Sequence, residues 1–126
     1  MHGFNDNIEK LTMENTLFRK VLFTGKYSQL VLMCLRPGES IGLEVHEGVD
    51  QFFRIEAGSG EVTIKGKTAS IRDGSAIIVP AGSEHNIVNT GDVDLKLYTV
   101  YSPPNHPPGT IHSTHQEAME AEADHH

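Results

Sequence analysis

The apolar residues of this chain recur at alternate positions or in short continuous runs, and turn residues separate these runs at short, even intervals. The pattern predicts strands at residues 17–24, 27–36, 41–46, 51–56, 61–65, 68–72, 76–79, 85–89 and 95–101. No segment between them has the spacing of an amphipathic helix. Short strands joined by turns are typical of an antiparallel sandwich or a closed barrel. We therefore predict an all-β fold, an antiparallel β-barrel over residues 17–101.

The segment 27–36 is too apolar to have one face in water, and we expect it to be covered on both sides. The dipeptide Pro37-Gly38 ends it. Cys34 lies inside this apolar run, which predicts a buried and inert thiol.

Both ends of the chain lack the alternation. Residues 1–16 are polar and predict an N-terminal arm with one helical turn near residues 8–13. The stretch after Tyr101 is rich in proline, cannot pair as a central strand, and is expected to run extended over the surface.

Within the tail, residues 102–126, Thr114 and Glu117 have the spacing of a capping box and predict a short C-terminal helix that ends near Ala123. His106 and His112 could lie across the barrel mouth or on the open surface. The last two residues could be the remains of an expression tag and are left out of any site: His125 and His126.

The composition limits the classes of partner. A chain of 126 residues fits one domain. Ten basic and 17 acidic residues give a net charge of −7, which argues against a nucleic acid or an anionic membrane as partner. One cysteine cannot form an internal disulfide, the N-terminus carries charges where a signal peptide needs an apolar core, and no apolar run reaches the ~20 residues of a membrane helix. We expect a cytoplasmic protein.

Strand alternation places several polar side chains on one interior surface. In 41–46, Glu44 and His46 share one face, and Ile41, Leu43 and Val45 are expected on the other. In 51–56, Gln51 shares a face with two apolar residues that would form the floor beneath it, Phe53 and Ile55, while Arg54 and Glu56 face outward. His85 is expected to face inward with Ile87 and Asn89.

Each of these four residues also has a simpler interpretation. A strand histidine is often a structural residue, Glu44 could face solvent, and Gln51 could be a cross-strand hydrogen-bonding partner. Together, however, they would bury a carboxylate that needs a cation. The sequence therefore predicts one divalent metal bound by Glu44, His46, Gln51 and His85. Nitrogen and oxygen ligands of this kind suit Mn, Fe, Co, Ni or Zn.

These residues lie in two motifs that resemble those of the cupin superfamily. The second family motif, G-x5-P-x-G-x2-H-x3-N, is matched at Gly74, Pro80, Gly82, His85 and Asn89. The first, G-x5-H-x-H-x(3,4)-E-x6-G, is matched in spacing by Gly38, Glu44, His46, Gln51 and Gly58. The resemblance implies a small single-domain cupin with the jelly-roll form of the β-barrel.

The first motif departs from the family at two ligands, since Glu44 stands where the family has His and Gln51 where it has Glu. The departure could mean a decayed site. Both sets nevertheless supply a single negative charge, which suggests that the carboxylate has moved from one ligand position to another. Asp50 would fit the shorter spacer, but alternation and the distance to Gly58 favour Gln51 and leave Asp50 at the rim.

The resemblance implies a small oxygenated metabolite as substrate or ligand, with chemistry of the isomerase, epimerase or dioxygenase kind. The alternative is a non-catalytic metal-containing binding or sensor module. Tyr98 or Tyr101 could reach the cavity, although core packing explains both. Because Leu43 and Val45 are expected to face outward, and because of the resemblance to small cupins, we also expect a homodimer.

Overall fold

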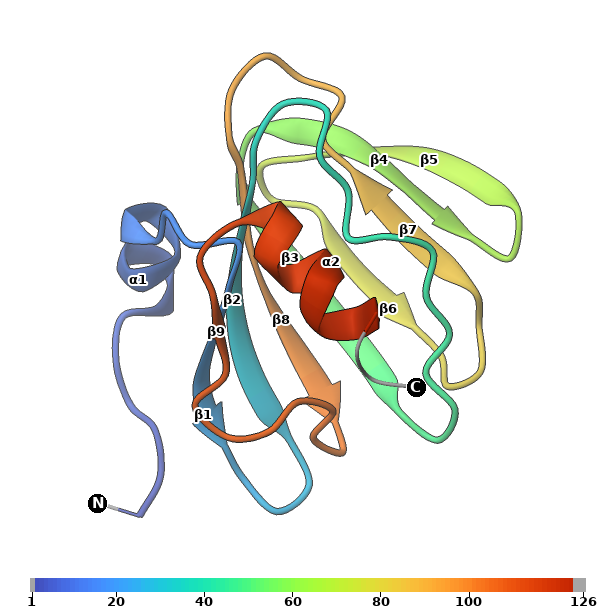
Figure 1. Cartoon of the computed structure of the whole chain (residues 1–126). Coiled ribbons are helices and arrows are strands. Elements are labelled where there is room, and N and C mark those ends of the chain that lie inside the picture. The colour runs from blue at the N-terminus through green and yellow to red at the C-terminus, as the bar shows by residue number, and fades with distance from the viewer. Residues whose placement is uncertain (1, 124–126) are drawn as a thin grey trace.

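The computed structural model describes residues 2–123, which form two antiparallel sheets facing each other (Figure 1). Their elements are α1 Ile8–Glu14, β1 Arg19–Thr24, β2 Gln29–Leu35, β3 Asp50–Ala57, β4 Ser59–Ile64, β5 Lys67–Arg72, β6 Ala76–Val79, β7 His85–Val88, β8 Leu95–Ser102, β9 Ile111–His112 and α2 His115–Ala123. The larger sheet has the order β6-β3-β8-β2-β1-β9, and the smaller one β5-β4-β7. The predicted all-β barrel with a short C-terminal helix is confirmed.

Alternating burial shows which side of each strand faces the core. On β3, Gln51, Phe53 and Ile55 are buried, while Arg54 and Glu56 pair with each other on the opposite face. Nearly all of β2 is buried, as its apolar sequence predicts. Cys34 is buried within it, and burial raises the pKa of its thiol to about 11, so the thiol is inert at neutral pH.

The prediction of a strand at 41–46 is wrong. This segment makes one isolated bridge, Glu44 with His85, and a second bridge lies just before it, Ser40 with Val88. Gly42 adopts φ +90°, a conformation that breaks the alternation of an extended chain. As a result Ile41 is 2% exposed and belongs to the core, whereas Leu43 is 65% exposed. The expectation that Ile41 shares an outward face with Leu43 and Val45 is therefore also wrong.

Helix α1 covers the outer face of the larger sheet, where it contacts β2, β3 and β8 (Figure 1). Asn7 caps it by accepting a hydrogen bond from the Lys10 N–H, and Thr12 is its fully buried residue. Lys96 on β8 donates to the carbonyl of Met13. The helix is longer than the single turn that the polar sequence predicts, because this packing supports it.

The C-terminal segment folds back over the opening between the sheets (Figure 1). It is held at its start by buried Gln29, which accepts from the N–H groups of Asn105 and His106 and donates to the His106 carbonyl at 2.7 Å. Strand β9 then pairs with the edge strand β1, with His112 opposite Arg19. Over the described residues, no helix is long and apolar enough to cross a membrane.

Helix α2 begins as its capping residues predict. The Glu117 N–H donates to the Thr114 hydroxyl, and the Glu117 carboxylate accepts from the Ser113 N–H. Ala118 is fully buried against the core, so the helix is docked along this face. The predicted tag residues His125 and His126 lie outside the described part of the chain.

Candidate metal centre

Glu44 and His85 are neighbours because an isolated antiparallel bridge joins their backbones. Each residue donates its N–H to the carbonyl of the other at 2.9 Å. Directly opposed residues in such a pair project their side chains to the same face. The two predicted ligands from different motifs therefore meet side by side.

His46 lies on the same side as Glu44, two residues away along the extended segment. Its carbonyl accepts from the Gly82 N–H at 3.0 Å, which ties it to the turn before His85. Its Nε2 lies 2.7 Å from Glu44 Oε2, and both side chains are 15% exposed. His46 Nε2 nevertheless makes no hydrogen bond, which at this length means that the direction is unfavourable.

The ring nitrogen of His85 that is available to a metal is Nε2. Its Nδ1 lies 3.0 Å from the Ser83 carbonyl, which can only accept, so Nδ1 carries the proton and Nε2 the lone pair. His85 is 1% exposed, and Nε2 is buried without a hydrogen-bond partner. A backbone carbonyl on the remote nitrogen is the usual arrangement for a metal-binding imidazole.

Gln51 presents a similar unpaired atom. Its Nε2 donates to the Thr99 hydroxyl at 3.0 Å, and that hydroxyl donates in turn to the Phe52 carbonyl at 2.8 Å. This chain fixes the amide and leaves Oε1 buried with no hydrogen-bond partner. A buried acceptor left unsatisfied costs about 1–3 kcal/mol, so Oε1 is a further candidate ligand.

The carboxylate of Glu44 and the imidazoles of His46 and His85 form a group that could hold a metal ion. Their candidate ligand atoms all lie within 4.8 Å of one another. Ligands bound at ~2.0–2.2 Å to one ion lie at most about twice that distance apart, so a small closure of the group would complete such a site. The residues present therefore fit a divalent ion, because two imidazoles and a carboxylate converge here and His85 Nε2 is buried without a partner.

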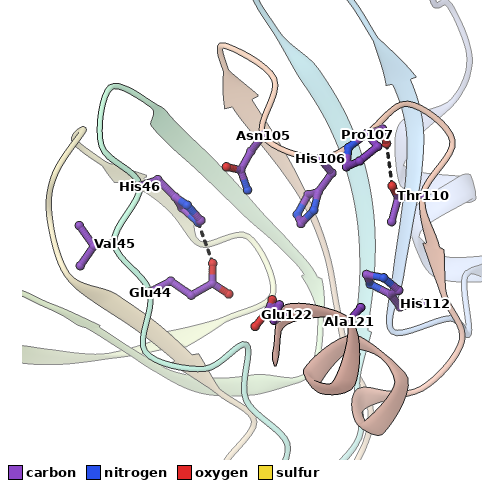
Figure 2. Close-up of a pocket in the computed structure, with 10 residues that line it drawn as sticks. All are labelled: Glu44, Val45, His46, Asn105, His106, Pro107, Thr110, His112, Ala121 and Glu122. Atoms are coloured by element: carbon purple, nitrogen blue, oxygen red, sulfur yellow. Dashed lines mark hydrogen bonds and ion pairs between the residues drawn. The ribbon is translucent and has the colours of Figure 1, made fainter. Parts of the chain in front are cut away.

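The group opens into a cavity of about 420 Å³ (Figure 2). One wall carries Glu44, Val45 and His46, and the other is formed by the C-terminal segment. The residues of that second wall are Asn105, His106, Pro107, Thr110, His112, Ala121 and Glu122. Of the two placements that the sequence left open for His106 and His112, the structure has the one across the barrel mouth.

Tyr101 connects the core to this cavity. Its ring stands edge-on to His46 at 5.7 Å and to His106 at 5.2 Å, and its hydroxyl lies 3.3 Å from His106 Nε2. Burial, reinforced by the Glu44 carboxylate, raises the pKa of Tyr101 far above its ordinary value. It is thus both a core residue and a neutral hydroxyl next to the site, while Tyr98 packs against Phe52 on the other face.

Arg19, His112 and Glu122 form a second polar group at the cavity. Arg19 is 1% exposed; its Nη1 donates to His112 Nδ1 at 3.0 Å, and its Nη2 lies 3.5 Å from Glu122 Oε1. Burial and then Glu44 raise the pKa of Glu122, while Arg19 and His46 lower it. Sequence reasoning missed Glu122, although it lies four residues after buried Ala118 and thus on the buried face of α2.

Two acidic neighbours of the motifs lie apart from the metal group. Asp50 is exposed and accepts from the Ala81 N–H at 2.8 Å, which stabilises the turn before His85. Glu84 is exposed, as alternation predicts from its position next to His85. Asn89, the last motif residue, is buried and donates to the carbonyls of Leu35 and Val93.

Comparisons with known proteins agree with this architecture. The crystal structure of BH2720 from Bacillus halodurans superposes with a TM-score of 0.91 at 45% identity and covers 93% of both chains. The Bacillus subtilis (strain 168) protein YrkC is 51% identical over 123 residues, 92% of this chain and 66% of its own. The oxalate-binding protein of Thermotoga maritima is 34% identical over 84 residues, 67% of this chain and 69% of its own.

This chain thus spans about two thirds of the length of these two curated relatives. The model of the cupin domain family matches residues 31–101, which include the extended segment and all four predicted ligands. The chain belongs to the cupin domain family.

Proposed function

We propose that Glu44, His46, Gln51 and His85 hold one divalent transition metal, Mn, Fe, Co, Ni or Zn, and that a small oxygenated metabolite binds next to it in the cavity. The observation that carries the proposal is a pair of buried atoms without partners, His85 Nε2 and Gln51 Oε1, next to a close contact between His46 Nε2 and the Glu44 carboxylate. A divalent ion would satisfy all of them at once. Its ligands would be nitrogen and oxygen only, a set suited to these metals.

When bound, such an ion polarises a carbonyl or carboxylate oxygen as a Lewis acid. The chain supplies the surroundings for isomerase-, epimerase- or dioxygenase-like chemistry. Phe53 and Ile55 close the floor against water. Tyr101 keeps its proton and can donate a hydrogen bond at the cavity wall, and the C-terminal segment limits the size of the ligand.

A second candidate is a binding module without turnover. It is favoured by the oxalate-binding protein of Thermotoga maritima, whose name describes binding and not conversion. The two candidates differ in a screen of the metal-loaded protein against small sugars, keto acids, dicarboxylates and diols. Metal-dependent turnover of any of them supports the enzyme, and tight binding without turnover supports the binding module.

Single substitutions test the metal site directly. We expect His46→Ala and His85→Ala to lower the metal content from one ion per chain to nearly none, as measured by elemental analysis after reconstitution and desalting. Glu84→Ala is the matched control, since this neighbouring residue is exposed. A double histidine variant that keeps one ion per chain would disprove the assignment.

Two further proposals concern the molecule as a whole. Leu43 and Val45 are 65% and 45% exposed beside the cavity, and we propose that a second copy of the chain covers them. We propose a cytoplasmic location, because a chain with a single cysteine does not need an oxidising compartment to form an internal disulfide. Fractionation of cells that express the tagged full-length protein tests the location, and recovery in the exported fraction would contradict it.

A further inference from the structure

Glu122 is a carboxylate in the cavity wall that the proposed metal ligands leave unused. It lies in the last turn of α2 and lines the same cavity as Glu44 and His46 (Figure 2). Its side chain is 40% exposed, so it is open to a ligand in the cavity. It comes from the opposite wall, which a ligand bound beside Glu44 and His46 would face.

Arg19 holds this carboxylate in place. The guanidinium is buried at the edge of the barrel, donates to His112 on β9, and lies 3.5 Å from Glu122 Oε1. Burial and the Glu44 carboxylate raise the pKa of Glu122, whereas the neighbouring guanidinium favours its ionised form, and a divalent ion in the cavity would do the same. An ionised carboxylate accepts hydrogen bonds and cannot donate them.

The Glu122 carboxylate would distinguish between ligands that chelate a metal ion with the same geometry but differ in charge and in hydrogen-bond donors. Oxalate and glycolate both offer two oxygens that form a chelate ring of the same size. Oxalate presents only acceptor oxygens and a second negative charge, which Glu122 repels. Glycolate keeps a hydroxyl proton that Glu122 can accept. Like charges placed opposite each other discriminate against the wrong partner.

We propose that Glu122 biases the cavity toward 2-hydroxycarboxylates and against dicarboxylates of the same size. This inference rests on the proposed function, in which a small oxygenated ligand binds at the metal. It assigns to Glu122 the role of a specificity-determining residue that does not bind the ion.

The test is calorimetric titration of the zinc-loaded full chain with glycolate and with oxalate, in the wild type and in E122Q. The measured quantity is the ratio of the two dissociation constants in each protein, because comparing the ratios removes the intrinsic preference of zinc for oxalate. Glutamine keeps the size of the side chain, removes its charge and adds a donor. We expect the affinity for oxalate relative to glycolate to be about tenfold higher in E122Q than in the wild type. The increase should be smaller in E122A, because alanine adds no hydrogen-bond donor.

E120Q is the matched control, since Glu120 is on the exposed side of the same helix and bonds to Gln116. It should leave the ratio unchanged. An E122Q ratio equal to that of the wild type, or shifted toward glycolate, overturns the inference while the proposed function stands. Loss of zinc from E122Q also overturns it, because Glu122 would then be a ligand. If neither compound binds the zinc-loaded wild type more tightly than the zinc-free chain, the proposed function fails and the inference fails with it.

Discussion

Thr99 is the residue that decides how Gln51 faces the candidate metal site. It is fully buried on β8, accepts from Gln51 Nε2, and donates to the Phe52 carbonyl. Because the hydroxyl donates its one proton to the Phe52 carbonyl, it can only accept a hydrogen bond from the Gln51 amide. The Gln51 Oε1 atom therefore makes no hydrogen bond and remains available to a metal. A residue that no metal would touch thus sets the donor type of a proposed ligand.

Replacing Thr99 with valine removes this constraint while keeping nearly the same shape. We expect Thr99→Val to lower metal affinity by about 10–100-fold, the usual effect of losing a group that orients a ligand. Competition with a chromogenic chelator measures the affinity. Thr63→Val is the control, because Thr63 pairs with Thr68 away from the cavity. Unchanged affinity in Thr99→Val would mean that Gln51 does not bind the metal.

At the scale of elements, the local sequence pattern was sufficient to predict the regular strands. Period-two alternation predicts the buried face of β3 and the bounds of β6, and the capping residues predict the start of α2. The pattern fails at Gly42, whose positive φ lets Ile41 enter the core while Glu44 and His46 still face the site. Alternation therefore gave the correct partners for Glu44 but the wrong face for Ile41.

The second cavity wall could not be predicted from local pattern. Gln29 binds the backbone of residues 105 and 106, and Arg19 joins His112 and Glu122, across long distances in the chain. A two-residue strand such as β9 also leaves no periodic signal. Contacts of this kind depend on the completed barrel, which is why the second wall, with Glu122, became visible only in the structure.

The contact between Arg19 and His112 predicts how the docking of β9 depends on pH. Burial, and then the Arg19 guanidinium, lower the pKa of His112, although Glu117 opposes them. The folded chain therefore resists protonation of His112 more than the unfolded chain does. The resulting stability is present above the ordinary imidazole pKa and is lost as the pH falls through the lowered value.

We expect the unfolding midpoint of the metal-free wild type to fall between pH 7.5 and pH 5.5. In His112→Asn the fall should be smaller, by about 2 °C. Asparagine keeps an acceptor for Arg19 but does not titrate. Circular dichroism in the presence of a chelator measures the midpoint. His2→Asn, in the exposed arm, should behave like the wild type. Equal losses in His112→Asn and the wild type would contradict the prediction.

At the scale of the whole molecule, the barrel brings together proposed metal ligands that lie far apart in the sequence. The bridge between Glu44 and His85 joins the two motifs, and β3 brings Gln51 to the same interior. The same folding leaves Leu43 and Val45 exposed next to the cavity, where a second copy of the chain would bury them.

Sedimentation equilibrium tests this assembly. We expect a dimer whose dissociation constant rises about 100-fold in Leu43→Asp, because an unpaired charge would be buried at the interface. Ile78→Asp is the control, since Ile78 is similarly exposed on the edge strand β6. A monomer at high micromolar concentration would contradict the proposed homodimer.

The most direct test of the metal centre is a crystal structure of the metal-loaded protein, with anomalous data collected at the absorption edge of the metal. We predict one anomalous peak, at ~2.0–2.2 Å from His46 Nε2, His85 Nε2, a carboxylate oxygen of Glu44 and Gln51 Oε1. A peak elsewhere, or a stoichiometrically loaded protein in which His46 and His85 do not touch the ion, would contradict the assignment.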